Sequence, residues 1–217
     1  MNVPCINRKT EHKGFLHAND LISFAADIPY ANLTLKYTQI IQRIDYINTK
    51  IKFVYLSYKK NITDKPHLEL ANISEHSFII EEIIYWLRIT SDELISLLYV
   101  CKYFNKEKTH PKKIKFEKID DLLKNKNSEL SKLLTNYLSS LETLNNISNA
   151  YKHSFVNSQL NIIGGHEPIV PALSLLYNNT SNQIKFHSIE LAKVINDFDI
   201  FFGFTDKYIR THFSSKQ

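Results

Sequence analysis

Residues 127–159 read NSELSKLLTNYLSSLETLNNISNAYKHSFVNSQ, and this stretch decides the fold. Apolar side chains recur along it in steps of four and three residues, the spacing of one stripe down a helix that packs lengthwise on another helix. The stripe consists of Leu130, Leu134, Tyr137, Leu141, Leu144, Ser148, Tyr151 and Phe155. The pattern predicts a long helix near residues 128–158, with the rest of the chain packed against its apolar side.

Two more stretches show a helical spacing of apolar residues over many turns. Residues 33–58 predict one long helix, and residues 74–104 predict a second helix that begins at a Ser74 cap. We expect the second helix to be broken close to Thr90, because Thr-Ser-Asp-Glu is typical of a new helix start. Shorter predicted elements are a helix over 17–28, loops over 61–66 and 105–115, and a helical piece over 116–125.

The periodicity changes after residue 159. Residues 172–177 and 183–188 are rich in strand-forming side chains, and five polar residues separate them. We therefore expect a β-hairpin over 170–189. Ser188 is then expected to cap a last helix. The inner side of that helix carries Leu191, Val194, Ile195, Phe198, Phe201 and Phe202.

The composition predicts one helical domain. The chain has 217 residues, 43% of them hydrophobic, and only 4 glycines and 6 prolines, which suits long helices with few turns. The sequence contains no internal repeat and no clear linker. It predicts a single all-α helical bundle over residues 1–217, with a small β-hairpin before the last helix. Residues 1–16 are expected to form a loosely ordered lead-in.

The charge, the cysteines and the apolar segments of the sequence argue against a zinc-binding, a disulfide-rich and a membrane-spanning protein. The formal net charge is +5, a mild basic bias that permits a nucleic-acid partner without requiring one. Cys5 and Cys101 form neither a zinc motif nor a disulfide framework, and the sequence predicts no metal and no cofactor. Residues 1–10 lack an apolar signal segment, and no stretch approaches the roughly 20 apolar residues of a membrane span. We therefore expect a cytoplasmic protein that does not insert into a membrane.

One polar row on the predicted helix near 128–158 contains groups that can do chemistry. Asn145, Asn149 and His153 recur at four-residue intervals and share one side of the helix, with His153 nearly opposite the apolar stripe. A histidine beside amides and lysines can act as a general base near neutral pH, or bind a phosphate group when protonated. The simpler interpretation of the same residues is a solvated polar face.

The run from Ser148 to His153, SNAYKH, lies late in this helix of an all-α bundle. It resembles the signature of the HEPN superfamily, in which an Arg, usually followed by a polar residue such as Asn, precedes a His by some five residues. The resemblance implies a helical bundle that pairs as a homodimer, with the two motifs facing each other. Many HEPN domains are metal-independent ribonucleases of bacterial toxin–antitoxin and antiviral systems. Others have lost the motif and act as binding or structural modules.

The chain departs from this signature at one position. Ser148 stands where the family has Arg, and a neutral hydroxyl cannot stabilise charge on a scissile phosphate. Lys152 supplies a positive charge one turn further along, without the planar fork of an arginine. We therefore expect a non-catalytic or weakly active HEPN-like module of a bacterial defence or stress system, which binds RNA or a protein partner. The alternative is a metal-independent, toxin-like endoribonuclease whose catalytic residues are His153, Asn149 and Lys152.

Three other features have a simpler structural interpretation. Residues 164–167, Gly-Gly-His-Glu, are expected to form a plain turn rather than a phosphate-binding loop. Arg88 and Asp92 are four residues apart and predict an ordinary ion pair within one helix. A basic run contains His110, Lys112, Lys113, Lys115 and Lys118, with Phe116 among them. Such a run can track a phosphate backbone, and a solvated loop is the simpler interpretation.

Overall fold

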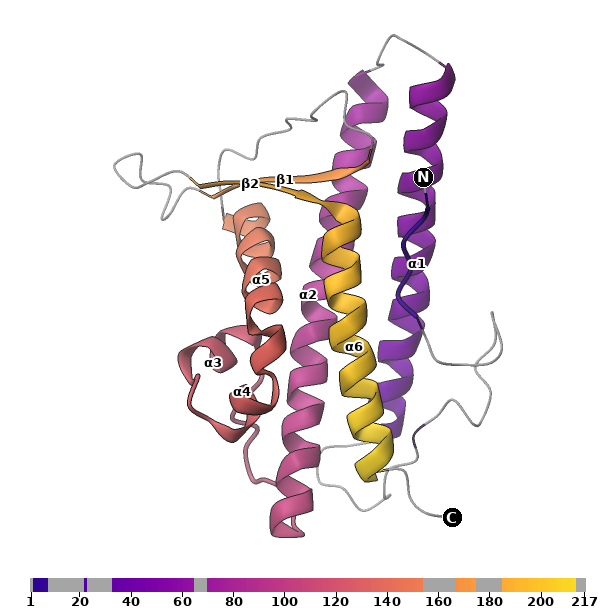
Figure 1. The fold of residues 1–217 in the computed structure, drawn as a ribbon. Helices are drawn as coiled ribbons and strands as arrows, with labels where there is room; N and C mark the ends of the chain where they lie inside the picture. Colours follow the sequence, from indigo (N-terminus) through magenta and orange to yellow (C-terminus); the bar gives the residue numbers. More distant parts are fainter. Residues whose placement is uncertain are drawn as a thin grey trace.

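Three long helices form the framework of the molecule (Figure 1). The computed structural model describes residues 2–7, 22, 33–64, 70–153, 167–174 and 185–213. Helices α1 (Leu33–Asp64) and α2 (Leu70–Glu107) lie side by side and antiparallel, and α6 (Leu191–Phe213) packs against α2. The elements between α2 and α6 are α3 (Ile119–Lys124), α4 (Glu129–Leu133), the 3-10 turn η2 (Thr135–Tyr137), α5 (Leu138–His153), β1 (Ile169–Ser174) and β2 (Lys185–Glu190). The prediction of an all-α bundle with a small hairpin before the last helix is confirmed.

Helix α1 confirms the helix predicted over 33–58 and is longer than predicted. It continues to Asp64, so the loop expected over 61–66 is wrong for residues 61–64. Asn, Thr and Asp cost only a few tenths of a kcal/mol each in a helix, which one more turn of a long helix tolerates. Residues 65–69, which include the last two residues of the predicted loop, lie outside the described part of the chain.

Helix α2 is continuous from Leu70 to Glu107, so the break predicted close to Thr90 is wrong. The hydroxyl of Thr90 donates to the carbonyl oxygen four residues earlier, at 2.6 Å, and the hydroxyl of Ser91 does the same at 2.9 Å. Both polar side chains are thereby satisfied inside the helix instead of capping a new one. The predicted start at Ser74 is also wrong, because α2 begins one turn earlier.

The stretch 127–159 does not form the single long helix that was predicted near 128–158. It contains α4, η2 and α5, because the backbone leaves helical geometry at Leu134, with φ −98° and ψ 14°. The hydroxyl of Thr135 donates to two carbonyl oxygens of the preceding turn, at 2.9 and 3.2 Å, which stabilises the tightened turn. Residues 154–158 lie outside the described part of the chain.

The apolar stripe of this stretch packs as predicted despite the bend. Its leucines and Ser148 are buried, and both of its tyrosines are half-buried. The Tyr151 hydroxyl donates to the carbonyl oxygen of Pro171 at 2.8 Å and so ties α5 to β1. A bend of one turn therefore changes the direction of the chain without exposing the apolar side.

The predicted hairpin over 170–189 is confirmed, with the last helix starting later than expected. β1 and β2 pair antiparallel, with Ala172 opposite His187. Ser188 lies inside β2, so its predicted role as the cap of the last helix is wrong. Helix α6 starts at Leu191, whose backbone N–H donates to the carbonyl oxygen of Pro168 at 2.9 Å. The polar turn predicted over 178–182 lies outside the described residues.

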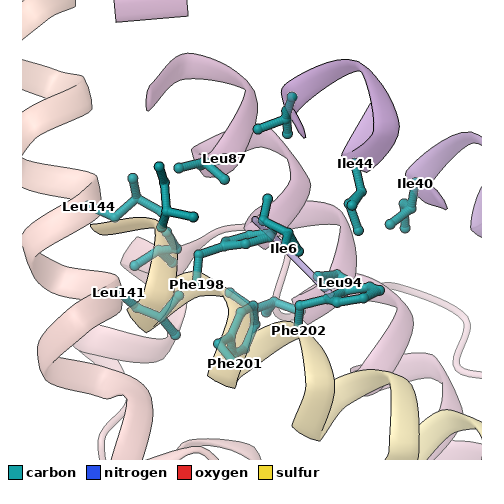
Figure 2. Close-up of a cluster of buried hydrophobic side chains, with 14 of the residues drawn as sticks. Ile6, Ile40, Ile44, Leu87, Leu94, Leu141, Leu144, Phe198, Phe201 and Phe202 are labelled. Carbon is teal, nitrogen blue, oxygen red and sulfur yellow. The ribbon is translucent and has the colours of Figure 1, made fainter. Parts of the chain in front are cut away.

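The core lies between α1, α2, α5 and α6, and Figure 2 shows the middle of it. Phe198, Phe201 and Phe202 project from α6 towards leucines of α2 and α5. All the inner residues predicted for the last helix are buried: Leu191, Val194, Ile195, Phe198, Phe201 and Phe202. Among the described helices, none has an apolar stretch long enough to cross a membrane.

Two residues of the lead-in expected over 1–16, Ile6 and Asn7, contact the helical bundle. Ile6 is buried in the core, and its backbone N–H and carbonyl both pair with the Asn48 side chain of α1, at 2.9 and 3.0 Å. The backbone N–H of Asn7 donates to the carboxylate of Asp199 on α6 at 2.6 Å. The helix predicted over 17–28 lies outside the described residues, apart from buried Ile22.

Candidate functional site

The predicted row of polar residues on α5 is not one open face. Asn145 is 3% exposed, and its amide nitrogen donates to a carboxylate oxygen of Asp120 at 2.9 Å. Asn149 is half-buried, and only His153 at the end of α5 is exposed. The difference arises because α3 packs across α5 and covers the earlier part of the row. The helical spacing was predicted correctly, whereas the neighbour that buries Asn145 could not be seen in the spacing.

Lys152 turns towards α2 rather than towards His153. Its amine lies 5.2 Å from the centre of the Tyr85 ring, within the range of a cation–π contact. Partial burial lowers the pKa of Lys152, and the nearby positive charges of Arg88 and Lys118 lower it further. In the described part of the chain, no hydrogen bond or ion pair joins His153 to another side chain. The three residues predicted to act together therefore do not form one hydrogen-bonded group.

Ser148 lies on the buried side of α5. It is 2% exposed, and its hydroxyl has no hydrogen-bond partner among the described residues. A side chain at this position faces the packed core and not a solvent-filled cleft. The Ser148 hydroxyl is therefore not exposed to a ligand in solution.

Arg88 and Asp92 form the predicted ion pair, with 3.0 Å between Nη1 and Oδ2, and the pair is buried rather than solvated. The other oxygen of Asp92 accepts the backbone N–H of Ile119 at 2.9 Å, so the carboxylate also holds the first residue of α3. Burial raises the pKa of Asp92, although the Ile119 hydrogen bond and Arg88 act in the opposite direction. This carboxylate therefore joins α2 to the segment that follows the basic run.

The basic run lies on an exposed loop over residues 108–118, and neighbouring residues of the fold hold this loop in place. Lys112, Lys113, Lys115 and Lys118 are exposed, and no described carboxylate forms an ion pair with any of them. The loop contains five lysines and one glutamate, whereas the formal net charge of the whole chain is only +5. Most of the net positive charge is therefore concentrated here.

A ring contact, a buried proline and two backbone hydrogen bonds hold this loop in place. The ring of His110 stacks on Phe104 with 4.6 Å between centroids, and Pro111 is buried. A carboxylate oxygen of Asp121 accepts the backbone N–H groups of residues 117 and 118 at 2.9 and 3.1 Å. The sequence favoured a solvated loop, and the lysines are indeed solvated. The anchoring was not predicted because it depends on residues on both sides of the run.

A pocket of about 250 Å³ lies beside the loop, between the end of α2 and the start of α4. Its walls include three aromatic rings, and Lys115 stands on its rim. Lining residues are Tyr99, Lys102, Tyr103, Lys106, Glu107, Lys115, Phe116, Ser128, Glu129 and Leu130. This pocket was not predicted from the sequence, because its walls come from three separate segments. The only signal was Phe116 inside a run of lysines.

Two lysines at the pocket are paired with a carboxylate, and a third lysine is not. Glu129 lies 3.3 Å from Lys106 and 3.6 Å from Lys102, and these contacts lower the pKa of Glu129, with Lys106 contributing most. Lys115 has no carboxylate partner within the described ranges. A negative ligand group at the rim would therefore meet Lys115 without competition from a fixed ion pair.

The outer face of α1 and α2 has a different electrostatic character. Arg43 lies over the ring of Trp86, 5.2 Å from its centroid, but its guanidinium is bound to Glu93 at 2.6 Å. Lys50 likewise lies over Tyr46 and is bound to a glutamate of α2 at 2.9 Å. Both cations are therefore engaged in ion pairs, and Glu93 is shared with Lys36 at 2.5 Å. A ligand phosphate at this face would compete with these carboxylates.

No protein-family model, curated protein or solved structure matches the chain. Among the described residues, no three His, Cys, Asp or Glu side chains are grouped so that they could hold a metal ion.

Proposed function

We propose that this chain is a non-catalytic helical RNA-binding module of the HEPN-like kind. The observation that carries the proposal is the anchored loop over 108–118, which concentrates solvated lysines without carboxylate partners in the described structure. Lysines of this kind bind phosphate groups and release the counterions that surround a nucleic acid. An anchored loop loses less conformational entropy on binding than a freely moving one.

The placement of the predicted catalytic residues favours binding over cleavage. Ser148 is buried where the HEPN signature has Arg, and Lys152 lies over an aromatic ring of α2. His153 is left exposed, without a hydrogen bond or ion pair to a described side chain. General acid–base catalysis needs a positioned histidine and a group that stabilises charge on the phosphate. The alternative of an endoribonuclease that uses His153, Asn149 and Lys152 is tested alongside the proposal.

The test measures binding of a short fluorescent RNA by anisotropy at several salt concentrations. The variant K112Q/K113Q/K115Q removes three lysines of the loop. The matched control, K52Q/K185Q/K207Q, removes three exposed lysines from α1, β2 and α6 and changes the net charge equally. If the loop contacts the phosphates, the loop variant should bind more weakly. A plot of the logarithm of the binding constant against the logarithm of the salt concentration has a negative slope. The loop variant should make this slope shallower by about 2, since each lost phosphate contact to single-stranded RNA removes about 0.7.

Equal losses in the loop variant and the control would refute a specific role for the loop, and an absence of RNA binding by the unaltered protein would refute the proposal. A parallel incubation of RNA with the protein in EDTA tests for metal-independent cleavage. We expect intact RNA with the unaltered protein and with His153→Ala. Cleavage that His153→Ala abolishes would establish the endoribonuclease alternative.

A further inference from the structure

We infer that the pocket beside the lysine loop binds one unpaired base of single-stranded RNA while the neighbouring phosphates lie on the loop. This inference rests on the proposed RNA-binding function and names the form of RNA that the site selects. Three features of the pocket support it: its aromatic walls, the unpaired lysine on its rim, and its position at the edge of the basic loop.

The rings line the pocket without covering one another. The centroids of Tyr99 and Phe116 are 5.5 Å apart with planes tilted by 49°, and those of Tyr99 and Tyr103 are 6.2 Å apart with planes tilted by 47°. Rings at these angles form adjoining walls and not a closed stack. Tyr103 and Phe116, which both line this pocket, can contact a flat, apolar-faced group, which a nucleobase provides.

The lysines beside the pocket favour a nucleotide over a purely apolar ligand, because a nucleotide carries a phosphate next to its base. Lys115 stands on the rim, and Lys112 and Lys113 lie further along the same exposed loop. A single RNA strand presents a base and a chain of phosphates together, so one segment can occupy the aromatic pocket and the lysines at once. A duplex keeps its bases paired and stacked, and its phosphates alone can reach the loop.

The aromatic face on α1 and α2 is a weaker candidate for the same ligand. Tyr46 and Trp86 are close there, with 6.4 Å between centroids, and two cations lie over them. Those cations are Arg43 and Lys50, and both are bound to glutamates of α2. A phosphate arriving at this face would have to displace a carboxylate, whereas at Lys115 it would not.

Tyr103 is the residue that tests the inference most cleanly. Tyr99 and Phe116 pack against the hydrophobic core, so their removal would also disturb the fold. Tyr103 is half-buried at the pocket and contacts the Tyr99 ring. Tyr103→Ala removes one aromatic wall, and Tyr103→Phe keeps the wall without its hydroxyl.

The experiment compares one RNA sequence as a single strand and as a blunt duplex, by anisotropy, with the unaltered protein and both Tyr103 variants. Tyr103→Ala should weaken single-strand binding about fivefold or more, the effect of losing one base–aromatic stack, and leave duplex binding unchanged. Tyr103→Phe should retain single-strand binding. A 2-aminopurine in the single strand should be quenched on binding to the unaltered protein and not on binding to Tyr103→Ala.

The possible failures point to different conclusions. If Tyr103→Ala binds single strand and duplex as the unaltered protein does, and K112Q/K113Q/K115Q binds both more weakly, the base pocket is refuted and RNA binding by the loop stands. If K112Q/K113Q/K115Q binds no more weakly than K52Q/K185Q/K207Q, the loop has no specific role in RNA binding, and the inference that places the phosphates on the loop fails with it. If the unaltered protein binds no RNA, the proposed function and the inference both fail. An equal loss in Tyr103→Ala and Tyr103→Phe would refute stacking as the source of binding.

Discussion

Removal of the Asp92 carboxylate should destabilise the protein strongly, because two partners would be left buried without it. Asp92→Ala leaves the guanidinium of Arg88 without its counter-charge, 3.0 Å away in the native protein, and leaves the N–H of Ile119 without its acceptor. Loss of one partner of a buried pair costs about 3–5 kcal/mol, and an unsatisfied buried N–H adds about 1 kcal/mol or more. The expected loss in free energy of unfolding is about 4–6 kcal/mol.

Two further variants separate the charge from the hydrogen bond. Asp92→Asn keeps an oxygen that can accept from Ile119 and should cost about 1 kcal/mol less than Asp92→Ala. The double variant R88M/D92N removes both charges and keeps that acceptor, so its stability should return to within about 1.5 kcal/mol of the unaltered protein. A total stability of about 5–15 kcal/mol makes these differences measurable by urea unfolding followed by circular dichroism.

Two results would refute the reasoning about Asp92. The first is a loss below about 1 kcal/mol for Asp92→Ala, which would mean that water reaches Arg88 in the native state. The second is a double variant as unstable as Asp92→Ala, which would mean that the charges do not compensate each other.

Three more outcomes are expected. Truncation of a stripe leucine, Leu134→Ala or Leu141→Ala, should cost about 2–5 kcal/mol because both side chains are buried, and an unchanged melting temperature would contradict their place in the core. His153→Ala should shift the melting temperature by about a degree or two at most, because the side chain is exposed, and a large fall would show that it packs in the native state. Burial lowers the pKa of His76 and His187, so the unfolded chain binds more protons just below about pH 6.5 and stability falls as the pH drops through that window. Thermal unfolding between about pH 7.5 and about 5.5 should therefore show a smaller fall for H76Q/H187Q than for the unaltered protein, and equal falls would exclude this origin.

The periodic parts of the fold could be predicted from the sequence, because apolar residues at helical spacing lie on one face of the helix and that face is buried. Leu130, Leu134, Leu141 and Leu144 are all buried as the pattern required. The errors arose where a polar residue had two ways to be satisfied. The Thr90 hydroxyl has the chemistry of a cap, and in the native helix it bonds back to its own preceding turn. Spacing alone cannot distinguish those two outcomes.

The candidate site was less predictable because it depends on contacts between distant segments. His153 was correctly expected to be exposed, whereas burial of Asn145 follows from its bond to Asp120 of α3, 25 residues earlier. The pocket combines Tyr103, Phe116 and Glu129, which no local pattern connects. The basic run itself was visible in the sequence. The anchoring that gives it a fixed shape was not.

The hydrogen bond between Asn7 and Asp199 has a consequence for how the protein is made. Its two residues are separated by 192 positions, and Ile6 beside it is buried in the core. During synthesis, Asn7 therefore lacks its hydrogen-bond partner Asp199 until α6 has left the ribosome. The phenylalanines of α6 also fill the middle of the bundle, so the nascent chain exposes apolar faces of α1, α2 and α5 until α6 has been synthesised. Packing of the bundle is thus complete only after α6 has been synthesised, because α6 provides the partner of Asn7.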